Sequence, residues 1–363
     1  MKICFLTSYY PPFIDALCNK YNFFLDLSYQ ESLNLILDEL YADTGSIYFY
    51  SKTYGNEASI IIQNFEILQK KWASENIGNI EENNWQEKIV LEQTKKMKPD
   101  VFYTESIQNH SSIFLDTIKK TVKLIVAWVS FPFNTLPNLN SVNLILTSTQ
   151  HYKTKFIKSG LNAEYMLPAF DYRIIERLKD NHKSIPFSFI GGISDVHKNR
   201  WEALNYLCKT TDIKIWGYGL PNLPKNIFKR IIKKDTYSRI RKKHRGELWG
   251  LEMYQTLHDS LISFNIHEDL LKGNVGNMRM FEATGVATAL LNDFGNNITS
   301  LFEPDKEIIT YKTLPEAVEK LNYYLQNPIV TKEIGLNAQK RTLKEYNYTN
   351  YTIQMTDFIK KLI

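Results

Sequence analysis

A segment near residue 280 carries the clearest sign of chemistry in this sequence. Gly273 and Gly276 can form a tight loop with accessible backbone, and Asn277 is a residue type that caps helices. A helix that begins just after Asn277 would present free N–H groups and the positive end of its dipole to a diphosphate. Arg279 would add guanidinium donors, and Glu282, about one turn further on, could accept the hydroxyls of a ribose. A capped helix with a solvated glutamate explains the same spacing, so both interpretations stay open here.

A histidine in the same region has a similar ambiguity. His267 lies two positions after the run Leu261–Asn265, which predicts a buried strand. A histidine at the end of a strand could contact donor phosphate or sugar, and it could equally be a structural residue. We keep His267 as a candidate for catalysis because two α/β domains in tandem would place it in a cleft between them.

The segments that must position these residues alternate between predicted strands and predicted helices. In the first half, short apolar runs are separated by helix-length segments, which indicates βαβ units and a parallel sheet. The predicted strands are Ile3–Thr7, Ile47–Tyr50, Val101–Tyr103, Val122–Trp128 and Leu144–Thr147, and the predicted helices include Ser32–Leu40 and Ile89–Met97.

The same alternation restarts after a polar segment, 181–186, so two α/β domains are predicted. Two doubly wound units in tandem would face one another across a cleft, and ligands of open α/β sheets bind outside the carboxyl ends of the strands. The last residues, 341–363, have an apolar stripe near helical spacing and are expected to cross back to the first domain. The predicted domains are 1–168, 169–345 and, for the returning helix, 346–363.

Composition restricts the class of protein. The chain has 363 residues with 44% hydrophobic and 23% charged residues, which is ordinary for globular domains. Its three cysteines, Cys4, Cys18 and Cys208, form no CxxC pair, so neither a zinc site nor a disulfide framework is expected. The N-terminus has no apolar run long enough for a signal peptide, and no stretch approaches a membrane span of roughly 20 residues. We therefore expect a cytoplasmic protein.

Basic residues are concentrated in one segment, 225–245, within a net charge of +5. Apolar residues recur there at helical spacing with Lys and Arg between them, as in a helix that lies on anionic lipid. Peripheral contact with the inner face of a membrane is one interpretation, and a solvated surface helix is the other. Nucleic acid is not an expected partner at this charge.

Several motifs together resemble a known family. The motifs Asn277–Gly285, Phe189–Arg200, Ile215–Gly219 and Arg245–Tyr254 are similar to the C-terminal domain of bacterial group 1 (family 4-like) glycosyltransferases of GT-B fold. Within that family the sequence most resembles the CgeB-like spore-maturation subgroup. Weaker motifs such as Tyr9–Phe13 extend the resemblance over nearly the whole chain.

The resemblance implies roles for particular residues. Glu282 would bind the donor ribose, and the loop after the first strand of the second domain, with Gly192, His197, Lys198 and Arg200, would neutralise the diphosphate. Many retaining relatives have a glutamate where this chain has Asn274, so no catalytic role is assigned to Asn274 beyond contact with the donor.

In the first domain, the resemblance points to the acceptor side. Glu105 and His110 follow the strand Val101–Tyr103, and the family commonly uses an acidic residue or a histidine from such loops near the acceptor. The sequence contains no Asp-x-Asp pair of the metal-dependent kind beside the candidate cations, so no metal or other cofactor is expected.

The resemblance therefore implies a GT-B glycosyltransferase, expected to be retaining, that moves a sugar from a nucleotide diphosphate sugar to a glycan or lipid-linked acceptor. Three alternatives remain open at this point: a nucleotide-sugar epimerase of the same fold, a non-catalytic glycan-binding protein and a DNA glucosyltransferase.

Overall fold

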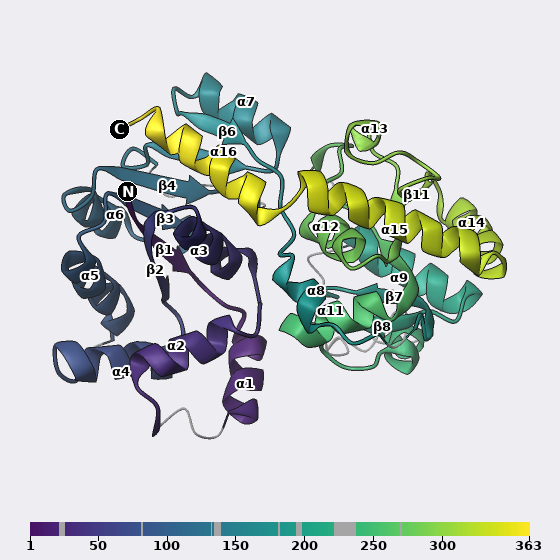
Figure 1. Cartoon of the computed structure of the whole chain (residues 1–363), viewed down its shortest axis with the longest axis horizontal. Coiled ribbons are helices and arrows are strands. Elements are labelled where there is room, and N and C mark those ends of the chain that lie inside the picture. The colour runs from purple at the N-terminus through teal and green to yellow at the C-terminus, as the bar shows by residue number, and fades with distance from the viewer. Residues whose placement is uncertain are drawn as a thin grey trace, which may run out of the picture. The chain divides into compact units, whose positions relative to one another are not determined.

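The structure is a computed structural model of the chain, and it describes residues 1–21, 26–80, 83–131, 133, 139–180, 182–193, 198–220, 237–268 and 271–363. The chain divides into two compact units (Figure 1). Unit 1 comprises Met1–Leu167 together with Tyr348–Ile363, and unit 2 comprises Pro168–Asn347.

Unit 1 is built on a six-stranded parallel sheet of order β2-β1-β3-β4-β5-β6. The strands are largely apolar and buried, as expected for a parallel sheet covered on both faces. The strands are β1 Lys2–Thr7, β2 Glu57–Ile62, β3 Val101–Thr104, β4 Leu124–Trp128, β5 Leu144–Thr147 and β6 Ala163–Tyr165. The helices are α1 Pro11–Lys20, α2 Tyr29–Leu37, α3 Asp43–Thr53, α4 Glu66–Asn76, α5 Trp85–Met97, the 3-10 turn η2 Ile107–Asn109, α6 Ser112–Lys119, α7 Gln150–Lys158 and α16 Tyr348–Lys360.

The prediction of a strand at Ile47–Tyr50 is wrong, because these residues lie inside α3. Their aromatic and β-branched side chains favour a strand locally. In the fold, α3 packs against β2 and β1, and α16 packs against α3, so tertiary contacts decide the outcome. The strand of this region is β2, which the sequence analysis missed.

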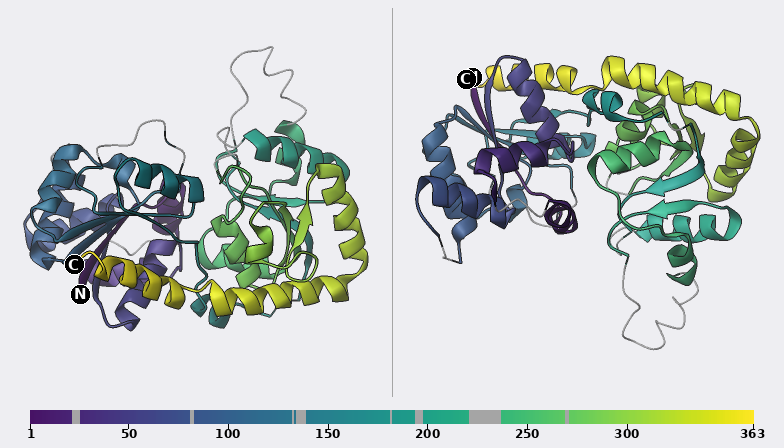
Figure 2. Two further views of the ribbon diagram at one scale, coloured as in Figure 1. Left: turned by 90° about the horizontal axis from the view of Figure 1, so that it is seen from above. Right: turned by 60° about the horizontal axis from the view of Figure 1, so that its bottom comes forward.

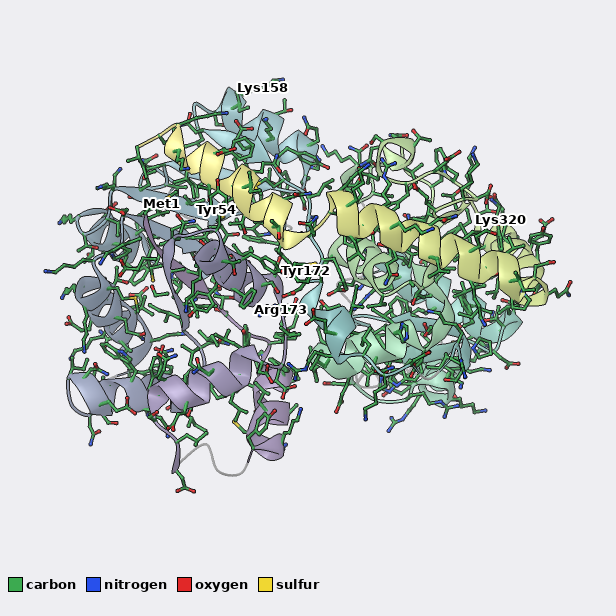
Figure 3. All side chains as sticks on the ribbon, viewed as in Figure 1. Met1, Tyr54, Lys158, Tyr172, Arg173 and Lys320 are labelled. Atoms are coloured by element: carbon green, nitrogen blue, oxygen red, sulfur yellow. The ribbon has the colours of Figure 1, made fainter. Side chains whose placement is uncertain are left out.

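The last helix, α16, belongs to unit 1 by its contacts. The ring of Tyr348 stacks on Tyr50 of α3, and Tyr351 lies against Trp128 at the end of β4. At the other end of α16, the ammonium of Lys360 lies over the ring of Tyr54, which Figure 3 labels just past the end of α3. Both ends of the chain therefore lie close together in this unit (Figure 2).

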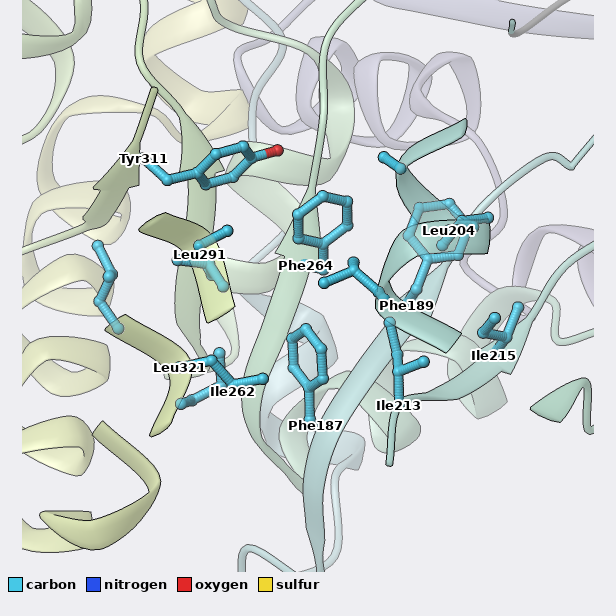
Figure 4. Packing of buried hydrophobic residues seen from close by; sticks show 14 of the residues in the cluster. Phe187, Phe189, Leu204, Ile213, Ile215, Ile262, Phe264, Leu291, Tyr311 and Leu321 are labelled. Atoms are coloured by element: carbon cyan, nitrogen blue, oxygen red, sulfur yellow. The ribbon is translucent and has the colours of Figure 1, made fainter. Parts of the chain in front are cut away.

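Unit 2 has a five-stranded parallel sheet of order β11-β10-β9-β7-β8. Its core is a cluster rich in aromatic side chains, with Phe264 of the central strand packed among Phe187, Phe189 and Tyr311 (Figure 4). The strands are β7 Ile185–Ile190, β8 Lys214–Trp216, β9 Ser260–Asn265, β10 Ala289–Asp293 and β11 Ile309–Tyr311. The helices are α8 Arg173–Arg177, α9 Lys198–Thr210, α11 Gly250–His258, α12 Met278–Gly285, α13 Ile298–Leu301, α14 Leu314–Gln326 and α15 Pro328–Glu345.

In both units the strands are parallel, so the segments that follow them gather at one edge of each sheet. We call this the carboxyl edge. In unit 2 it receives the segments after β7, β8, β9 and β10, and it is where the candidate residues of unit 2 lie.

Candidate functional site

The start of α12 is held by a network of asparagines. Asn277 caps the helix, its Oδ1 accepting from the backbone N–H of Met280 at 3.1 Å. The same side chain exchanges hydrogen bonds of 2.9 and 3.0 Å with Asn265, at the end of β9. Asn265 also donates to Asn292 of β10 at 2.7 Å. The helix start is thus tied to the ends of two neighbouring strands.

His267 orders the loop that leads into this helix. Its Nε2 accepts from the backbone N–H groups of Gly276 and Asn277 at 3.1 and 3.2 Å. An acceptor at Nε2 requires the ring proton on Nδ1, which donates to Asp293 Oδ1 at 2.7 Å. Both ring nitrogens are therefore engaged within the protein, and the two loop amides point at the imidazole.

The loop itself turns through left-handed backbone conformations. Gly273 and Gly276 have φ angles of 81° and 133°, values that favour glycine. Half-buried Asn274 closes the turn by donating its backbone N–H to Leu271 O at 3.0 Å. The glycines are thus needed for the path of the loop.

Arg279, the second residue of α12, forms an ion pair with Glu282, which lies about one turn further along the helix. Arg279 Nη1 lies 2.9 Å from Glu282 Oε2, and the two side chains are only 16% and 12% exposed. Tyr254 of α11 donates to Glu282 Oε1 at 3.4 Å, and the guanidinium of Arg279 lies 3.3 Å from the sulfur of Met253. The first turns of α11 and α12 therefore meet through these four side chains.

A second guanidinium, Arg200, lies in the first turn of α9, after β7. Its Nη1 donates to Gly192 O at 2.9 Å, and its Nε is 3.9 Å from Glu268 Oε1. Within the described part of the chain, Arg200 Nε is buried without a hydrogen-bond partner. Burial lowers the pKa of Arg200, while the nearby charge of Glu268 raises it.

Charged residues from several loops of the carboxyl edge lie near Arg200. The charges of Arg279 and Asp293 also act on it, so the segments after β7, β9 and β10 meet in one electrostatic neighbourhood. Gly192 allows a close approach, because a Cβ there would lie 3.1 Å from the ring of Tyr218, which stacks on Trp249. Two candidates cannot be placed: His197 and the side chain of Lys198 lie outside the described residues.

In unit 1, Glu105 lies at the carboxyl edge in a buried polar cluster. Its Oε2 accepts from Thr7 Oγ1 at 3.0 Å, whereas Oε1 is buried and has no hydrogen-bond partner in the described structure. Burial and the nearby charge of Asp43 raise the pKa of Glu105 to about 8. The carboxyl group is therefore largely protonated at neutral pH.

His110 lies in a different environment from Glu105. It is buried, its ring stacks on Phe114, and its Nε2 is 3.3 Å from Thr104 Oγ1. Burial lowers the pKa of His110 to about 4, so it is neutral near pH 7. No hydrogen bond joins it to Glu105 in the described part of the chain.

The described residues also bear on the expectations about metals, membranes and the basic segment. Among the described residues, no group of three or more His, Cys, Asp or Glu side chains is arranged to hold a metal ion. No helix in the described ranges is both long and apolar enough to cross a bilayer. Of the basic segment, 225–236 lies outside the described residues, and beyond it Arg239 donates to Asn205 at 2.9 Å and Lys243 pairs with Asp212 at 2.8 Å.

Tyr254 and Asp293 were not among the site residues predicted from the sequence. The signal for Asp293 was an acidic residue at the end of the apolar strand β10, where a side chain reaches the carboxyl edge. Tyr254 ends the motif Arg245–Tyr254 of the family resemblance, but its contact with Glu282 could not be predicted because Glu282 is on another helix.

The comparisons with known proteins agree on one family and one fold. A family profile described as "Glycosyl transferase-like" matches residues 173–357. No curated protein matches the sequence.

Solved structures resemble the whole chain. A glycosyltransferase from Rickettsia africae has a TM-score of 0.60 at 10% identity, covering 99% of this chain and 98% of its own. Sucrose-phosphate synthase from Thermosynechococcus elongatus has a TM-score of 0.58 at 7% identity, covering 100% and 99%. Anabaena HepE in complex with UDP-glucose has a TM-score of 0.58 at 12% identity, covering 99% and 100%. At such identities the likeness concerns the fold, and it confirms the predicted GT-B class.

Proposed function

Since this chain belongs to the glycosyl transferase-like family, we propose that unit 2 binds a nucleoside diphosphate sugar and that the enzyme transfers its sugar to an acceptor hydroxyl. The observation that carries this proposal is the convergence of Arg200, Arg279 and Glu282 at the carboxyl edge of unit 2. Cations suit a diphosphate and a carboxylate suits the hydroxyls of a ribose. HepE, a protein of the same fold, has been solved with UDP and with UDP-glucose.

Within this proposal the two arginines bind the diphosphate. The amides of Gly276 and Asn277 already donate to His267, so the guanidinium groups carry more of the interaction than the loop backbone does. Transfer leaves a nucleoside diphosphate with additional negative charge, which preorganised cations stabilise more in the transition state than in the ground state. His267 then serves to hold the loop rather than to exchange protons.

We further propose retention at the anomeric carbon without a metal ion. The bond from the anomeric carbon to the diphosphate oxygen breaks, and the acceptor oxygen forms its bond on the same face. The acceptor proton passes to the departing phosphate oxygen, so no protein nucleophile is required. NMR of the product, which reports the anomeric configuration, tests this: an inverted product would contradict it.

The acceptor proposal rests on the carboxyl edge of unit 1. The segments after its strands contain hydroxyl, amide and aromatic residues and a single acid, Glu105, with neither Lys nor Arg. These segments therefore supply no Lys or Arg of their own to an anionic acceptor, although the ammonium of Lys155 in α7 lies over the ring of Phe133. These segments are 8–10, 63–65, 105–111, 129–143 and 148–149.

Hydrogen bonds link several of these side chains. Ser8 Oγ accepts from Gln63 Nε2 at 2.9 Å and from Ser106 Oγ at 3.0 Å, which leaves its own hydroxyl proton to donate. Such groups suit the hydroxyls of an uncharged glycan. Of the glycan and lipid-linked acceptors expected from the resemblance, we therefore favour a neutral glycan.

A two-stage experiment tests the proposed function. A thermal-shift panel of nucleoside diphosphates and their sugars identifies the donor, since a ligand at 100 times its Kd stabilises the folded state by about 2.7 kcal/mol. Incubation of that donor with neutral glycans should then release nucleoside diphosphate in an acceptor-dependent reaction. Interconversion of the donor sugar without an acceptor would indicate an epimerase. Binding of glycan without turnover would indicate a glycan-binding protein. Salt-sensitive binding to duplex DNA would favour a DNA glucosyltransferase.

A further inference from the structure

Lys183 lies just before β7, at the edge of the unit 2 sheet opposite to the donor residues. Its ammonium donates to His258 O at 2.6 Å and to Ala287 O at 2.8 Å, and it lies 3.4 Å from Thr288 Oγ1. His258 is the last residue of α11, and Ala287 closely follows α12. One side chain therefore satisfies carbonyl groups at the ends of two helices, where no intrahelical donor is available.

Two further contacts reinforce this connection. Thr288 Oγ1 donates to Leu257 O, and His258 Nδ1 lies 3.1 Å from Val286 O. We call Lys183, His258 and Thr288 the amino-edge junction. None of the three belongs to the candidate site, yet their bonds join the end of α11, the segment before β7 and the segment after α12 to one another.

The proposed donor residues lie nearer the beginnings of the same two helices or at their middles. The first turns of α11 supply Met253 and Tyr254, which meet Arg279 and Glu282 of α12. At 1.5 Å per residue the junction at His258 lies about 6–8 Å along α11 from Met253 and Tyr254. Short helices move as rigid rods, so a shift at one end appears at the other.

We propose that Lys183 is a positioning residue for donor binding: it fixes the ends of α11 and α12 relative to each other, and thereby keeps Tyr254, Arg279 and Glu282 in register. This inference rests on the proposed function, because that proposal assigns those three residues to the donor. The charge of the ammonium suits its place, since a cation between two helix C-termini meets the negative ends of both dipoles.

The surroundings of Lys183 contain few other charges. Burial lowers its pKa to about 7, while Asp259 raises the pKa and Lys332 lowers it. A neutral amine would still have two N–H donors for the two nearest carbonyls. The junction therefore persists in either protonation state, and its geometry rather than its titration carries the proposal.

Lys183→Met tests the proposal, because methionine has a similar length and no donor. With UDP, or with the nucleoside diphosphate that the wild-type chain binds best, calorimetry should show an affinity about tenfold weaker. Lys332→Met is the matched control: it removes an exposed charge near Lys183 that belongs to α15 rather than to α11 or α12. Thr331→Val controls for stability alone, since its hydroxyl bonds to Tyr324 O of α14. Both controls should bind within twofold of wild type.

Hydrogen exchange gives a second readout that needs no ligand. Amides of 252–255 and 279–282 should exchange faster in Lys183→Met than in either control. If that variant does not fold, Thr288→Val removes part of the same junction and should show the same two effects more weakly. Wild-type affinity together with wild-type exchange in the folded variant would overturn the proposal. If the wild-type chain binds no nucleoside diphosphate, the proposed function fails, and exchange still decides the role of Lys183.

Discussion

At the scale of single residues, the environment of Glu282 determines what it offers to a ligand. Its Oε2 is paired with Arg279, whereas the hydrogen bond to Oε1 within the described ranges is the long 3.4 Å contact with Tyr254. A ribose hydroxyl could replace that weaker contact without breaking the ion pair. Arg279 would then remain oriented toward the diphosphate by the carboxylate beside it.

We predict that Glu282→Gln weakens binding of a nucleoside diphosphate. Loss of a charge-assisted hydrogen bond costs about 1.5–3 kcal/mol, which corresponds to roughly a 10- to 150-fold rise in Kd. Inorganic pyrophosphate has no ribose, so its affinity should not fall in the same variant. Glu319→Gln, which changes an exposed carboxylate on α14, is the control. Equal losses for both ligands would mean that Glu282 does not contact the ribose.

A second prediction at this scale concerns Glu105. Its pKa is raised from an unfolded value of 4.5 to about 8, so the folded state holds a proton that the unfolded state releases. The stabilisation is complete below pH 4.5 and is lost as the pH rises toward 8. Glu105→Gln removes this titration. The difference in unfolding free energy between wild type and variant should therefore decline from pH 5 to pH 8 in denaturant titrations, and a flat difference would contradict the assignment.

For the two candidate histidines, residue type and position in the sequence were not enough to predict their surroundings. His267 and His110 were both candidates for catalysis because of their position after strands. The partner that holds His267, Asp293, is 26 residues away and becomes a neighbour only because β9 and β10 pair. A single sequence does not specify that pairing, whereas Arg279 and Glu282 are three positions apart on one helix and their proximity could be predicted.

At the scale of elements, α12 depends on its cap. Asn277 both accepts from Met280 N and donates to Asn265, so it satisfies the helix start and fixes it to the sheet. The cap was predictable from residue type and position. Its second role was not, because it requires the ends of β9 and β10 to lie beside the helix.

We predict that Asn277→Asp and Asn277→Ala separate these two roles. Aspartate can still accept from the helix N–H but cannot donate to Asn265. Alanine loses both functions and should cost about 0.5–2 kcal/mol in unfolding free energy. Nucleotide affinity should fall in both variants, because the cap orients α12 and aspartate also adds negative charge beside the proposed diphosphate site. Ser28→Ala, which removes the cap of α2 in unit 1, is the control and should leave that affinity unchanged.

Other elements show where local sequence is sufficient. The buried strands β1, β3 and β9 match runs of apolar residues, because a strand covered on both faces needs them throughout. The strand β2 begins with half-exposed residues and was missed, while the aromatic run in α3 was assigned to a strand. Burial against α16 determines the structure of that run, and α16 is some 300 residues later in the chain.

At the scale of the whole molecule, we predict that turnover does not need a divalent metal. Two guanidinium groups and the α12 start are proposed to stabilise the departing diphosphate, which is the task of a metal in other transferases. Initial rates in excess chelator should therefore equal those with added Mg²⁺ or Mn²⁺. Rates that vanish in chelator and return with either ion would show that the arginines are insufficient.

The final prediction concerns α16, which completes unit 1 although unit 2 separates it from the rest of that unit in sequence. Met355 and Ile359 are fully buried, and Tyr348 and Tyr351 pack on Tyr50 and Trp128. Removing one such aliphatic side chain costs about 2–5 kcal/mol, so a chain that ends at Asn347 should lose the stability of unit 1 while unit 2 keeps its complete sheet.

Two measurements on that shortened chain separate the units. Calorimetric unfolding should show unit 1 melting at a lower temperature or already unfolded, and unit 2 should retain its affinity for the nucleoside diphosphate. Met355→Ala in the full-length chain gives a milder form of the same change, whereas Gln354→Ala, on the exposed side of α16, should have little effect. A shortened chain that unfolds in one unchanged transition and transfers sugar at the full rate would show that unit 1 does not depend on α16.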